Sequence, residues 1–526
     1  NGNYNDPAVV TYSFIPTGAD MSPIGPNITA QQDVTASAQA FVHTVLELYG
    51  NVANLTFSEV TETGTMDGGG DIRIGMGTLA DFGLTGQPTL GFAYQPFTGS
   101  GSSLSAQDTT NLTNFSYIGD VYLVQDYLGP DAFSAAYGDE RNTVSHEIGH
   151  ALGLDHPFND NGGSNAGFYP IDSSFTATNY TGSQTGGGHQ TDLADTMTET
   201  LMTYYNPYRV GDYTFGTSNG LVTAEAITTT PWQPGIQDIA ALQHLYGANM
   251  THNAGDDVYT YTTGEIVFEN IWDAGGYDII QHLGSDSANI DLNDGEFSTV
   301  GFYGGSSYMI TAADFGPGKV FSGFTPAEVS DAIFEMAADG STITFTLNVS
   351  TYGLDDDLVL DLMFTDGTTE TMNMTGIMPD RTHMTGNVGI AYGVIIEEAH
   401  GGSGADQLLG NEASNTLIGN GGTDVIYGGA GGDFLIGGEG DDFLNGGADI
   451  DYFVYDGGVG TNFGSDRILD FVAGTDNLVF DCLTLADLTI SIAGSDTLVD
   501  LGGGHVITLA GVTTGFSTSD DIIFVT

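Results

Sequence analysis

Short runs of alternating apolar and polar residues predict strands in the first part of the chain, and longer runs with helical spacing predict helices. Strands are expected at residues 11–15, 55–60, 71–76 and 119–123. A helix is expected over residues 30–49, with Thr29 as its cap. Further helices are expected from about Asp139 and over residues 238–247, which gives this part an α+β pattern. The apolar face of the first helix is formed by Val34, Phe41, Val42, Val45 and Leu48.

A repeat of nine residues covers residues 401–454, in the units GGSGADQLL, GNEASNTLI, GNGGTDVIY, GGAGGDFLI, GGEGDDFLN and GGADIDYFV. The pattern matches the GGxGxDxUx repeat of calcium-binding parallel β-rolls. A flexible Gly-rich linker is disfavoured, because it needs neither a strict period nor an apolar position in phase. The apolar eighth position should face the core of the roll at Leu408, Leu417, Ile426, Leu435, Leu444 and Phe453.

Residues 304–388 follow a different pattern. Thr325, Pro326 and Glu328 have the order of a helix cap, a first-turn proline and a capping-box acid, and they predict a helix that ends at Gly340. Alternation at 343–349 and 358–364 predicts strands, with a hairpin turn near Asp366-Gly367. We therefore expect a small α+β insertion, and a neutral elaboration is favoured over a substrate-binding module.

Acidic residues dominate the charge: 68 Asp+Glu face 6 Lys+Arg, for a formal net charge of -62 in 526 residues. Such a chain should repel nucleic acid and anionic membranes and attract divalent cations. The single cysteine, Cys482, excludes an internal disulfide framework, and no partner for nucleophilic chemistry can be identified for it. No apolar run long enough to span a membrane and no ordinary signal peptide is found, so stable membrane insertion is not expected.

The strongest chemical motif is HEIGHALGLDH at residues 146–156, an HExxHxxGxxH pattern. His146 and His150 fall on one face of a helix, one turn apart. Gly153 can adopt the positive φ that ends a helix, so that His156 can turn back toward the same point. Three imidazoles leave a zinc ion one open position for water, and Glu147 lies where it can take a proton from that water.

This motif resembles that of the metzincin metalloproteases, which place a methionine turn beneath the zinc. Leu201-Met202-Thr203-Tyr204 fits that turn, and its Met-x-Tyr form resembles the serralysin branch. The resemblance implies that Tyr204 is a further zinc ligand that helps to stabilise the oxyanion. Met197 is a rival for the turn without such a tyrosine, and an ordinary core methionine is the other interpretation of Met202.

The serralysin resemblance implies a zincin/metzincin catalytic domain at 1–250, which residues 238–247 would close, and an all-β calcium-binding parallel β-roll domain at 251–526 that contains the insertion. It implies calcium ligands at the start of the roll, at Asn253, Gly255, Asp257, Asp273, Gly275, Asp278 and Glu397. The implied ligands in the repeats are Gly402, Gly404, Asp406, Gly419, Gly421, Asp424, Gly428, Ala430, Asp433, Gly437, Glu439, Asp442, Gly446, Ala448 and Asp451. Asn415 replaces aspartate in the second unit, so a site that uses this turn should be weak or missing.

Together these features predict a secreted, zinc-dependent and calcium-stabilised endopeptidase in which Glu147 is the general base for zinc-activated water. One zinc ion and several calcium ions are expected, and the roll should remain disordered until calcium binds. Residues 91–94 and 120–123 could offer strand edges to an extended peptide. The last residues, 521–526, resemble the family's export signal for a signal-peptide-independent (type I) route.

The expected protein is a monomer that acts on proteins and peptides and could meet a proteinaceous inhibitor of the family's kind. A non-catalytic adhesin or surface-layer protein built on calcium repeats is the first alternative, and the intact zinc motif opposes it. A lipase-like repeat protein is the second alternative. It is disfavoured because no nucleophile elbow, a Gly-x-Ser-x-Gly turn from strand to helix, is evident.

Overall fold

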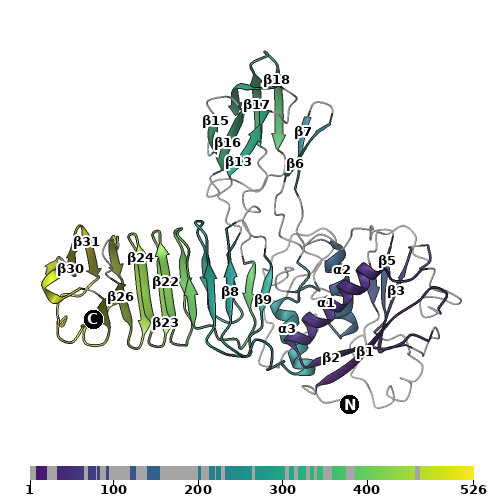
Figure 1. Ribbon diagram of the computed structural model, residues 1–526. Helices are drawn as coiled ribbons and strands as arrows, with labels where there is room; N and C mark the ends of the chain where they lie inside the picture. Colours follow the sequence, from purple (N-terminus) through teal and green to yellow (C-terminus); the bar gives the residue numbers. More distant parts are fainter. Residues whose placement is uncertain are drawn as a thin grey trace, which may run out of the picture.

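The structure is a computed structural model of the chain. It describes residues 7–19, 32–63, 69–78, 80–82, 91–93, 119–125, 139–154, 200–202, 213–218, 221–226, 231–263, 267–301, 307–312, 318–326, 332–336, 341–347, 358–374, 386–456, 462–481 and 483–525. Figure 1 shows an N-terminal part with helices beside a sheet, a stack of strands that ends at the C-terminus, and a lobe of strands that rises between them.

The N-terminal part is built on a mixed sheet with the order β2-β1-β3-β5-β4. Strands β1, β2, β3 and β5 are parallel to their neighbours, whereas β4 is antiparallel to β5 and forms an edge. The predicted strands are confirmed, with ends that differ by a few residues. The bounds are β1 Ala8–Phe14, β2 Leu55–Glu59, β3 Ile72–Gly77, β4 Gly91–Ala93 and β5 Val121–Val124.

Helices α1 (Ala36–Val52) and α2 (Asp139–Ala151) pack with this sheet, and α3 (Ile236–Tyr246) packs with α1. The predicted start of the first helix at residue 30 is wrong. Gln32 instead forms an isolated bridge with Met76, and Thr35 is the cap, since its hydroxyl accepts a hydrogen bond from Ala38 N at 3.3 Å. The buried face of α1 includes Phe41, Val42 and Val45, as predicted.

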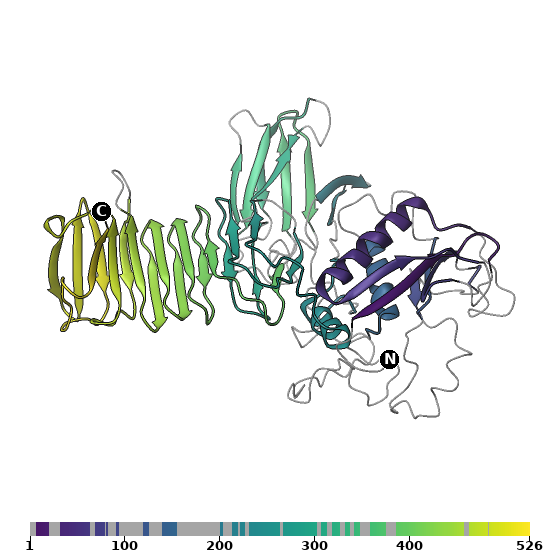
Figure 2. The ribbon, with the colours of Figure 1, turned by 60° about the horizontal axis from the view of Figure 1, so that its bottom comes forward.

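The β-roll consists of two sheets whose strands stack side by side toward the C-terminus (Figures 1 and 2). The first has the order β32-β28-β26-β24-β22-β20-β10-β8, with all pairs parallel. Its strands are β8 Val258–Tyr261, β10 Ile279–His282, β20 Glu398–His400, β22 Thr416–Gly421, β24 Phe434–Glu439, β26 Tyr452–Asp456, β28 Asn477–Asp481 and β32 Ile522–Val525.

The second sheet of the roll has the order β11-β21-β23-β25-β27-β31-β30-β29, and only its last two pairings are antiparallel. A 3-10 helix, η6 (Leu485–Asp487), precedes β29. The strands are β11 Asn289–Asp291, β21 Gln407–Leu409, β23 Val425–Ala430, β25 Phe443–Ala448, β27 Ser465–Ile468, β29 Thr489–Ala493, β30 Asp496–Gly502 and β31 His505–Leu509.

Successive nine-residue units alternate between the two sheets, so that Leu408 pairs with Ile426 and Leu417 with Leu435. The predicted core position is confirmed: each of the six apolar eighth-position side chains is at most 1% exposed. The roll is longer than the repeat, because β8, β10 and β11 precede residue 401 and strands β27 to β32 follow residue 454 in the same sheets. A small sheet of β12 (Phe297–Ser298), β19 (Val388–Ile390) and β9 (Glu269–Ile271) lies at the start of the roll.

The elements that the structure describes in the insertion are mainly strands, and the predicted helix over residues 325–340 is wrong. Thr325 and Pro326 end strand β14 (Phe321–Pro326), and Ala332–Met336 is strand β15, which pairs with β16 (Thr342–Leu347). The local capping signal is overridden by this pairing. The predicted strand at 343–349 is confirmed as β16. The predicted strand at 358–364 and the turn at Gly367 (φ 82°) are confirmed in the hairpin of β17 (Leu358–Phe364) and β18 (Thr369–Met374).

The insertion is not closed on itself. Its strands form one sheet of β13 (Ser307–Thr311), β16 and β15, and a second with the order β14-β17-β18-β7-β6. The hairpin β6 (Tyr213–Ser218) and β7 (Leu221–Ala226) comes from between Met202 and α3, and β7 lies parallel to β18. Residues 216–220 (GTSNG) have Gly-x-Ser-x-Gly spacing, which sequence reasoning missed. The described residues on either side belong to the antiparallel strands β6 and β7, however, whereas a nucleophile elbow leads from a strand into a helix.

Candidate metal centres

Helix α2 places His146, Glu147 and His150 in the interior of the N-terminal part. Their side chains are 5%, 8% and 7% exposed. The two imidazole rings meet edge to face, with centroids 4.7 Å apart and an interplanar angle of 90°. One turn of helix therefore brings both rings to one point, as the spacing of four residues predicts.

Each of these two imidazoles is fixed by a backbone carbonyl. His146 Nδ1 lies 2.7 Å from Leu201 O, and His150 Nδ1 lies 2.9 Å from Leu154 O. A carbonyl oxygen can only accept, so Nδ1 carries the proton and the Nε2 of the neutral ring keeps its lone pair. Outer partners of this kind set the tautomer of zinc-binding histidines. The donor chemistry of the pair therefore fits a zinc ion.

The Glu147 carboxyl lies against the edge strand β4. A hydrogen bond from the Ala93 backbone favours its charged form, but burial is the larger effect and raises the pKa of this carboxyl to about 8. Strand β4 approaches α2 closely: a Cβ at Gly91 would lie 2.9 Å from Thr143 Cγ2 and 3.1 Å from Glu147 Cγ. Glu147 is thus a buried carboxyl that lies beside a strand edge and next to the two imidazoles, and its burial raises its pKa.

Met202 packs directly under the ligand helix and is fully buried. A Cβ at Gly149, between the two histidines, would lie 3.0 Å from Met202 Sδ and 3.0 Å from the Tyr49 hydroxyl. Met202 therefore lies directly against the segment of α2 that joins the two histidines. Gly153 ends the helix with a φ of 101°, as predicted. His156, Tyr204 and Met197 lie outside the described residues.

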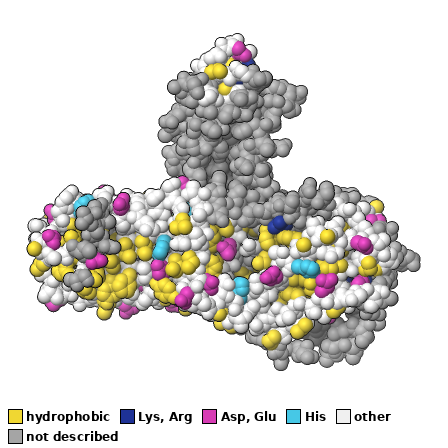
Figure 3. Space-filling view, viewed as in Figure 1, with side chains coloured by type: hydrophobic (Ala, Val, Ile, Leu, Met, Phe, Trp, Pro, Cys, Tyr) yellow, Lys and Arg dark blue, Asp and Glu magenta, His cyan; other side chains and the backbone are white. Residues whose placement is uncertain are grey.

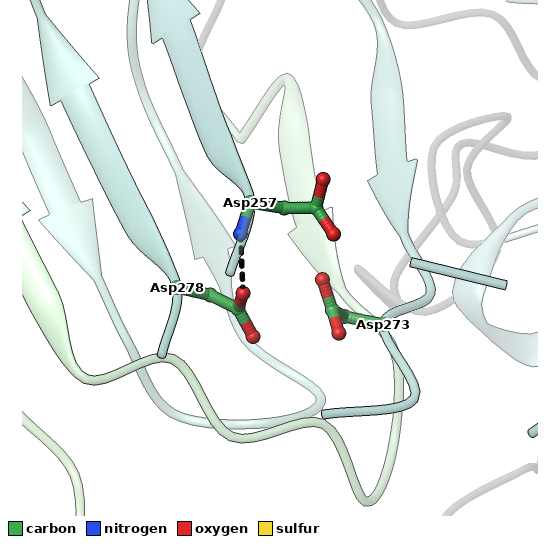
Figure 4. A group of neighbouring side chains, drawn as sticks. All are labelled: Asp257, Asp273 and Asp278. Carbon is green, nitrogen blue, oxygen red and sulfur yellow. Dashed lines mark hydrogen bonds between the residues drawn. The ribbon is translucent and has the colours of Figure 1, made fainter. Parts of the chain in front are cut away.

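A second candidate centre lies at the start of the roll (Figure 4). Within the described ranges, the metal-binding atoms of Asp257, Asp273 and Asp278 all lie within 4.8 Å of one another. Asp278 Oδ1 accepts from Asp257 N at 2.8 Å, and Glu397 Oε2 accepts from Asp278 N at 2.9 Å. Asn253 is linked to this cluster, because its amide donates to the Tyr259 hydroxyl, which donates to Asp273 Oδ2.

Glycine is needed around this cluster. Gly275 donates its N–H to Asp273 Oδ1 and has a φ of 121°, in the left-handed region that favours glycine. Burial raises the pKa of Asp278 to about 6, and neighbouring carboxylates add to this. Asp278 Oδ2 has no hydrogen-bond partner among the described residues. Several carboxylates that converge with an orphaned oxygen fit a calcium ion.

The aspartates of the repeats form two columns along the roll. In the first column, Asp424 Oδ1 accepts from Asp406 N at 2.8 Å, and Asp442 Oδ1 accepts from Asp424 N at 2.9 Å. In the second, Asp433 Oδ1 accepts from Asn415 N at 2.8 Å, and Asp451 Oδ1 accepts from Asp433 N at 3.1 Å. Residues from alternate units therefore stack in register.

These columns leave buried carboxylate oxygens without donors. Oδ2 of Asp424, Asp433 and Asp442 has no hydrogen-bond partner within the described part of the chain. Burial raises the pKa of Asp424 and Asp433 to about 7, and that of Asp406, Asp442 and Asp451 to about 6. A buried, unsatisfied carboxylate is costly unless a cation compensates it, so the columns fit calcium.

Asn415 shows how a turn closes without an acid. Its Oδ1 accepts from Asn411 N at 2.8 Å, and its Nδ2 donates to the carbonyls of Ile396 and Glu397, at 3.2 Å each. The amide thus supplies donors where its neighbours leave an orphaned oxygen. This arrangement supports the prediction of a weak or missing site at this turn.

Sequence reasoning missed that both columns continue beyond residue 454. Asp466 Oδ1 accepts from Asp442 N at 3.0 Å, and Asp476 Oδ1 accepts from Asp451 N at 3.3 Å. The separations are 24 and 25 residues, instead of the 18 between alternate units, so the period of nine does not reveal them. The signal that could have found them is an aspartate at the start of an alternating strand: Asp466 is the second residue of β27, and Asp476 directly precedes β28.

Comparison with known proteins places the chain among relatives. A family model described as Peptidase M10 serralysin C terminal matches residues 363–502. Serralysin C of Dickeya chrysanthemi is 31% identical over 271 residues, which are 49% of this chain and 46% of that protein. Metallopeptidase AprA of Pseudomonas marginalis is 30% identical over 308 residues, or 56% and 54% of the two proteins. The chain is a relative of the serralysin-type metalloproteases.

This relative of the serralysins spans about half the length of the curated relatives it matches. Among solved structures, the AlgE6R3 subunit of the Azotobacter vinelandii mannuronan C5-epimerase is 32% identical, with a TM-score of 0.20, over 23% of this chain and 80% of that one. No helix in the described part of the chain is long and apolar enough to cross a membrane.

Proposed function

We propose that this serralysin relative is a secreted, zinc-dependent and calcium-stabilised endopeptidase. One observation carries the proposal: α2 brings two imidazoles to one point with their tautomers fixed, and it holds Glu147 beside them in a buried setting. In this proposal the catalytic domain has a metzincin fold and covers residues 1–250, with the roll at 251–526. The gap between the end of α3 at Tyr246 and the start of β8 at Val258 is consistent with that boundary.

His146, His150 and His156 would hold the zinc ion, with Tyr204 as a further ligand. A bound zinc ion supplies Lewis acidity and can lower the pKa of a water ligand to about 7. Glu147 accepts a proton from the attacking water and passes it to the leaving amine. The Tyr204 hydroxyl stabilises the oxyanion. Strand β4 is a sheet edge in contact with the zinc helix, so an extended peptide can pair with it.

Calcium ions would be held by Asp257, Asp273 and Asp278 with Glu397, and by the two aspartate columns with carbonyls of the Gly-rich turns. The whole chain carries a net charge of -62 and only 6 Lys+Arg, so few cations offset the repulsion between the clustered aspartates of a calcium-free roll. Figure 3 shows acidic side chains over the described face, with few Lys or Arg. This dependence on calcium would delay folding of the roll until the chain has left the cell by type I export. The proposed enzyme acts as a monomer on proteins and peptides.

The test is casein hydrolysis by wild type, Glu147→Ala and Glu47→Gln, each purified with calcium. Glu47 lies exposed on α1, and its variant controls for the loss of one acidic charge. Removal of a general base should lower kcat by about 10²–10⁴-fold, whereas Glu47→Gln should keep full activity. A zinc chelator should abolish hydrolysis and added zinc should restore it. Equal activity of Glu147→Ala and wild type would refute the proposal.

A further inference from the structure

The carboxyl of Asp238 on α3 is fully buried and accepts three hydrogen bonds. Its Oδ2 accepts from Leu201 N at 2.7 Å and from Gly235 N at 2.9 Å. Its Oδ1 accepts from the Thr200 hydroxyl at 2.7 Å. All three donors point at the oxygens of this one carboxylate, and two of them, Leu201 N and the Thr200 hydroxyl, come from the segment directly before Met202.

Thr200 carries this interaction onward. Its Oγ1 donates to Asp238 and accepts from Met202 N at 3.0 Å. Met202 N belongs to the same peptide group as Leu201 O, and Leu201 O accepts from His146 Nδ1 at 2.7 Å. A continuous chain of hydrogen bonds therefore runs from the carboxylate through a hydroxyl and a peptide group to the imidazole.

We propose that Asp238 is a positioning residue for the zinc ligand His146 and acts on it through Thr200 and the Leu201–Met202 peptide. Chains of hydrogen bonds polarise one another when they are buried, so the negative end at Asp238 makes Leu201 O a stronger acceptor. A stronger acceptor fixes the His146 ring and raises the basicity of its Nε2, as a carboxylate does when it bonds a zinc-binding histidine directly. The inference rests on the proposed function, since it concerns the same metal centre.

The substitution Asp238→Asn separates this role from support of α3. The two backbone donors on the Oδ2 side require an oxygen, so the amide of Asn must turn its NH2 toward Thr200. The contacts to Leu201 N and Gly235 N are kept, while the charge is lost and the hydrogen bond to Thr200 is reversed. Thr200→Val breaks the chain at its middle without a change in α3, and Thr200→Ser restores the hydroxyl.

Tyr246→Phe is the matched control. Tyr246 lies on the same helix, and its hydroxyl donates to Leu152 O, near the end of α2, at 2.7 Å. Its loss removes one hydrogen bond to the ligand helix outside the chain that leads to His146. If Asp238 only stabilised the packing of α3 on α2, Tyr246→Phe and Asp238→Asn would have similar effects on the metal.

The measurement is zinc affinity of the full-length chain in saturating calcium, by competition with a colorimetric chelator that does not bind calcium. Urea unfolding of each zinc-free variant checks that it is folded. Asp238→Asn and Thr200→Val should weaken zinc binding about 10–100-fold, whereas Thr200→Ser and Tyr246→Phe should bind like wild type. If Asp238→Asn does not fold, Thr200→Val against Thr200→Ser gives the same comparison.

Wild-type affinity in folded Asp238→Asn and Thr200→Val, or an equal loss in Tyr246→Phe, would overturn the inference and leave the proposed function intact. His150→Ala separates the two proposals. If wild type binds no zinc, or His150→Ala binds it as tightly as wild type, the proposed function itself is wrong, and the role of Asp238 falls with it.

Discussion

Removal of calcium should make the stability of the roll depend on pH, because protons can then bind the column aspartates and partly replace the calcium ions. In the metal-free protein, burial raises the pKa of Asp424 and Asp433 from 3.8 to about 7. The folded chain then binds more protons than the unfolded chain between about pH 4 and pH 7. Stability must therefore fall as pH rises through that window, which is the opposite of ordinary acid denaturation.

The size of the effect follows from the columns. Taken alone, the shift of Asp424 corresponds to about 4 kcal/mol, because each pKa unit is worth about 1.4 kcal/mol. Counterions, and water that enters an opened turn, screen part of this energy. Each column aspartate should therefore change the free energy of unfolding by about 1–2 kcal/mol. For the five repeat aspartates this sums to about 5–10 kcal/mol, which is comparable to the net stability of a typical domain, about 5–15 kcal/mol. The calcium-free roll should therefore be unfolded at pH 7.5 and should regain structure near pH 5.

The assay is far-ultraviolet circular dichroism and urea unfolding of the full-length chain at pH 5.0, 6.0 and 7.5, with chelator or with calcium. Calcium-loaded protein is the control and should be most stable at pH 7.5. In chelator, Asp424→Asn should stabilise the roll at pH 7.5, because Asn415 shows that an amide can close this turn. A chelated roll that is folded at pH 7.5, or less stable at pH 5 than at pH 7.5, would refute the reasoning.

Three substitutions test the packing that supports both halves. Gly149→Ala should lower the free energy of unfolding in urea by about 1–3 kcal/mol, because the new Cβ would lie only 3.0 Å from Met202 Sδ and from the Tyr49 hydroxyl. Unchanged stability would contradict this packing. Leu435→Ala should cost about 2–5 kcal/mol in calcium, because the side chain is fully buried in the roll, and a smaller loss would argue for a loose core. Arg73→Ala should cost about 3–5 kcal/mol, because the buried carboxylates of Glu62 and Asp120, at 3.0 Å and 3.7 Å from the guanidinium, lose their cation. Urea stability equal to that of wild type would argue against this pairing.

Local patterns predicted the parts of the structure in which neighbours along the chain make the contacts. The spacing in HExxH puts His146 and His150 on one face of any helix, and the glycine after it ends that helix with a positive φ. The period of nine places Leu417 and Leu435 in the core of the roll, because each unit meets only its nearest neighbours.

Contacts between distant segments could not be predicted in this way. The cap signal at Thr325 is a correct local preference, yet Thr325 pairs with Asp361 in β17, 36 positions away in the numbering, and sheet pairing overrides it. Asp238 is an ordinary first-turn acid in the sequence of α3. Its partners Thr200 and Leu201 lie 38 and 37 residues earlier, and only the fold brings them together.

The number of donors, more than burial, separates the two kinds of aspartate in this chain. Asp238 and Asp424 are both fully buried, and burial raises the pKa of each, to about 6 and about 7. Both oxygens of Asp238 are satisfied, by three donors, and a cation there would have to displace them. Asp424 receives one backbone N–H, and its Oδ2 has no partner among the described residues. With 6 Lys+Arg for 68 acids, such orphaned oxygens cannot all be neutralised by side chains, and the proposed calcium ions would supply the missing counter-charge.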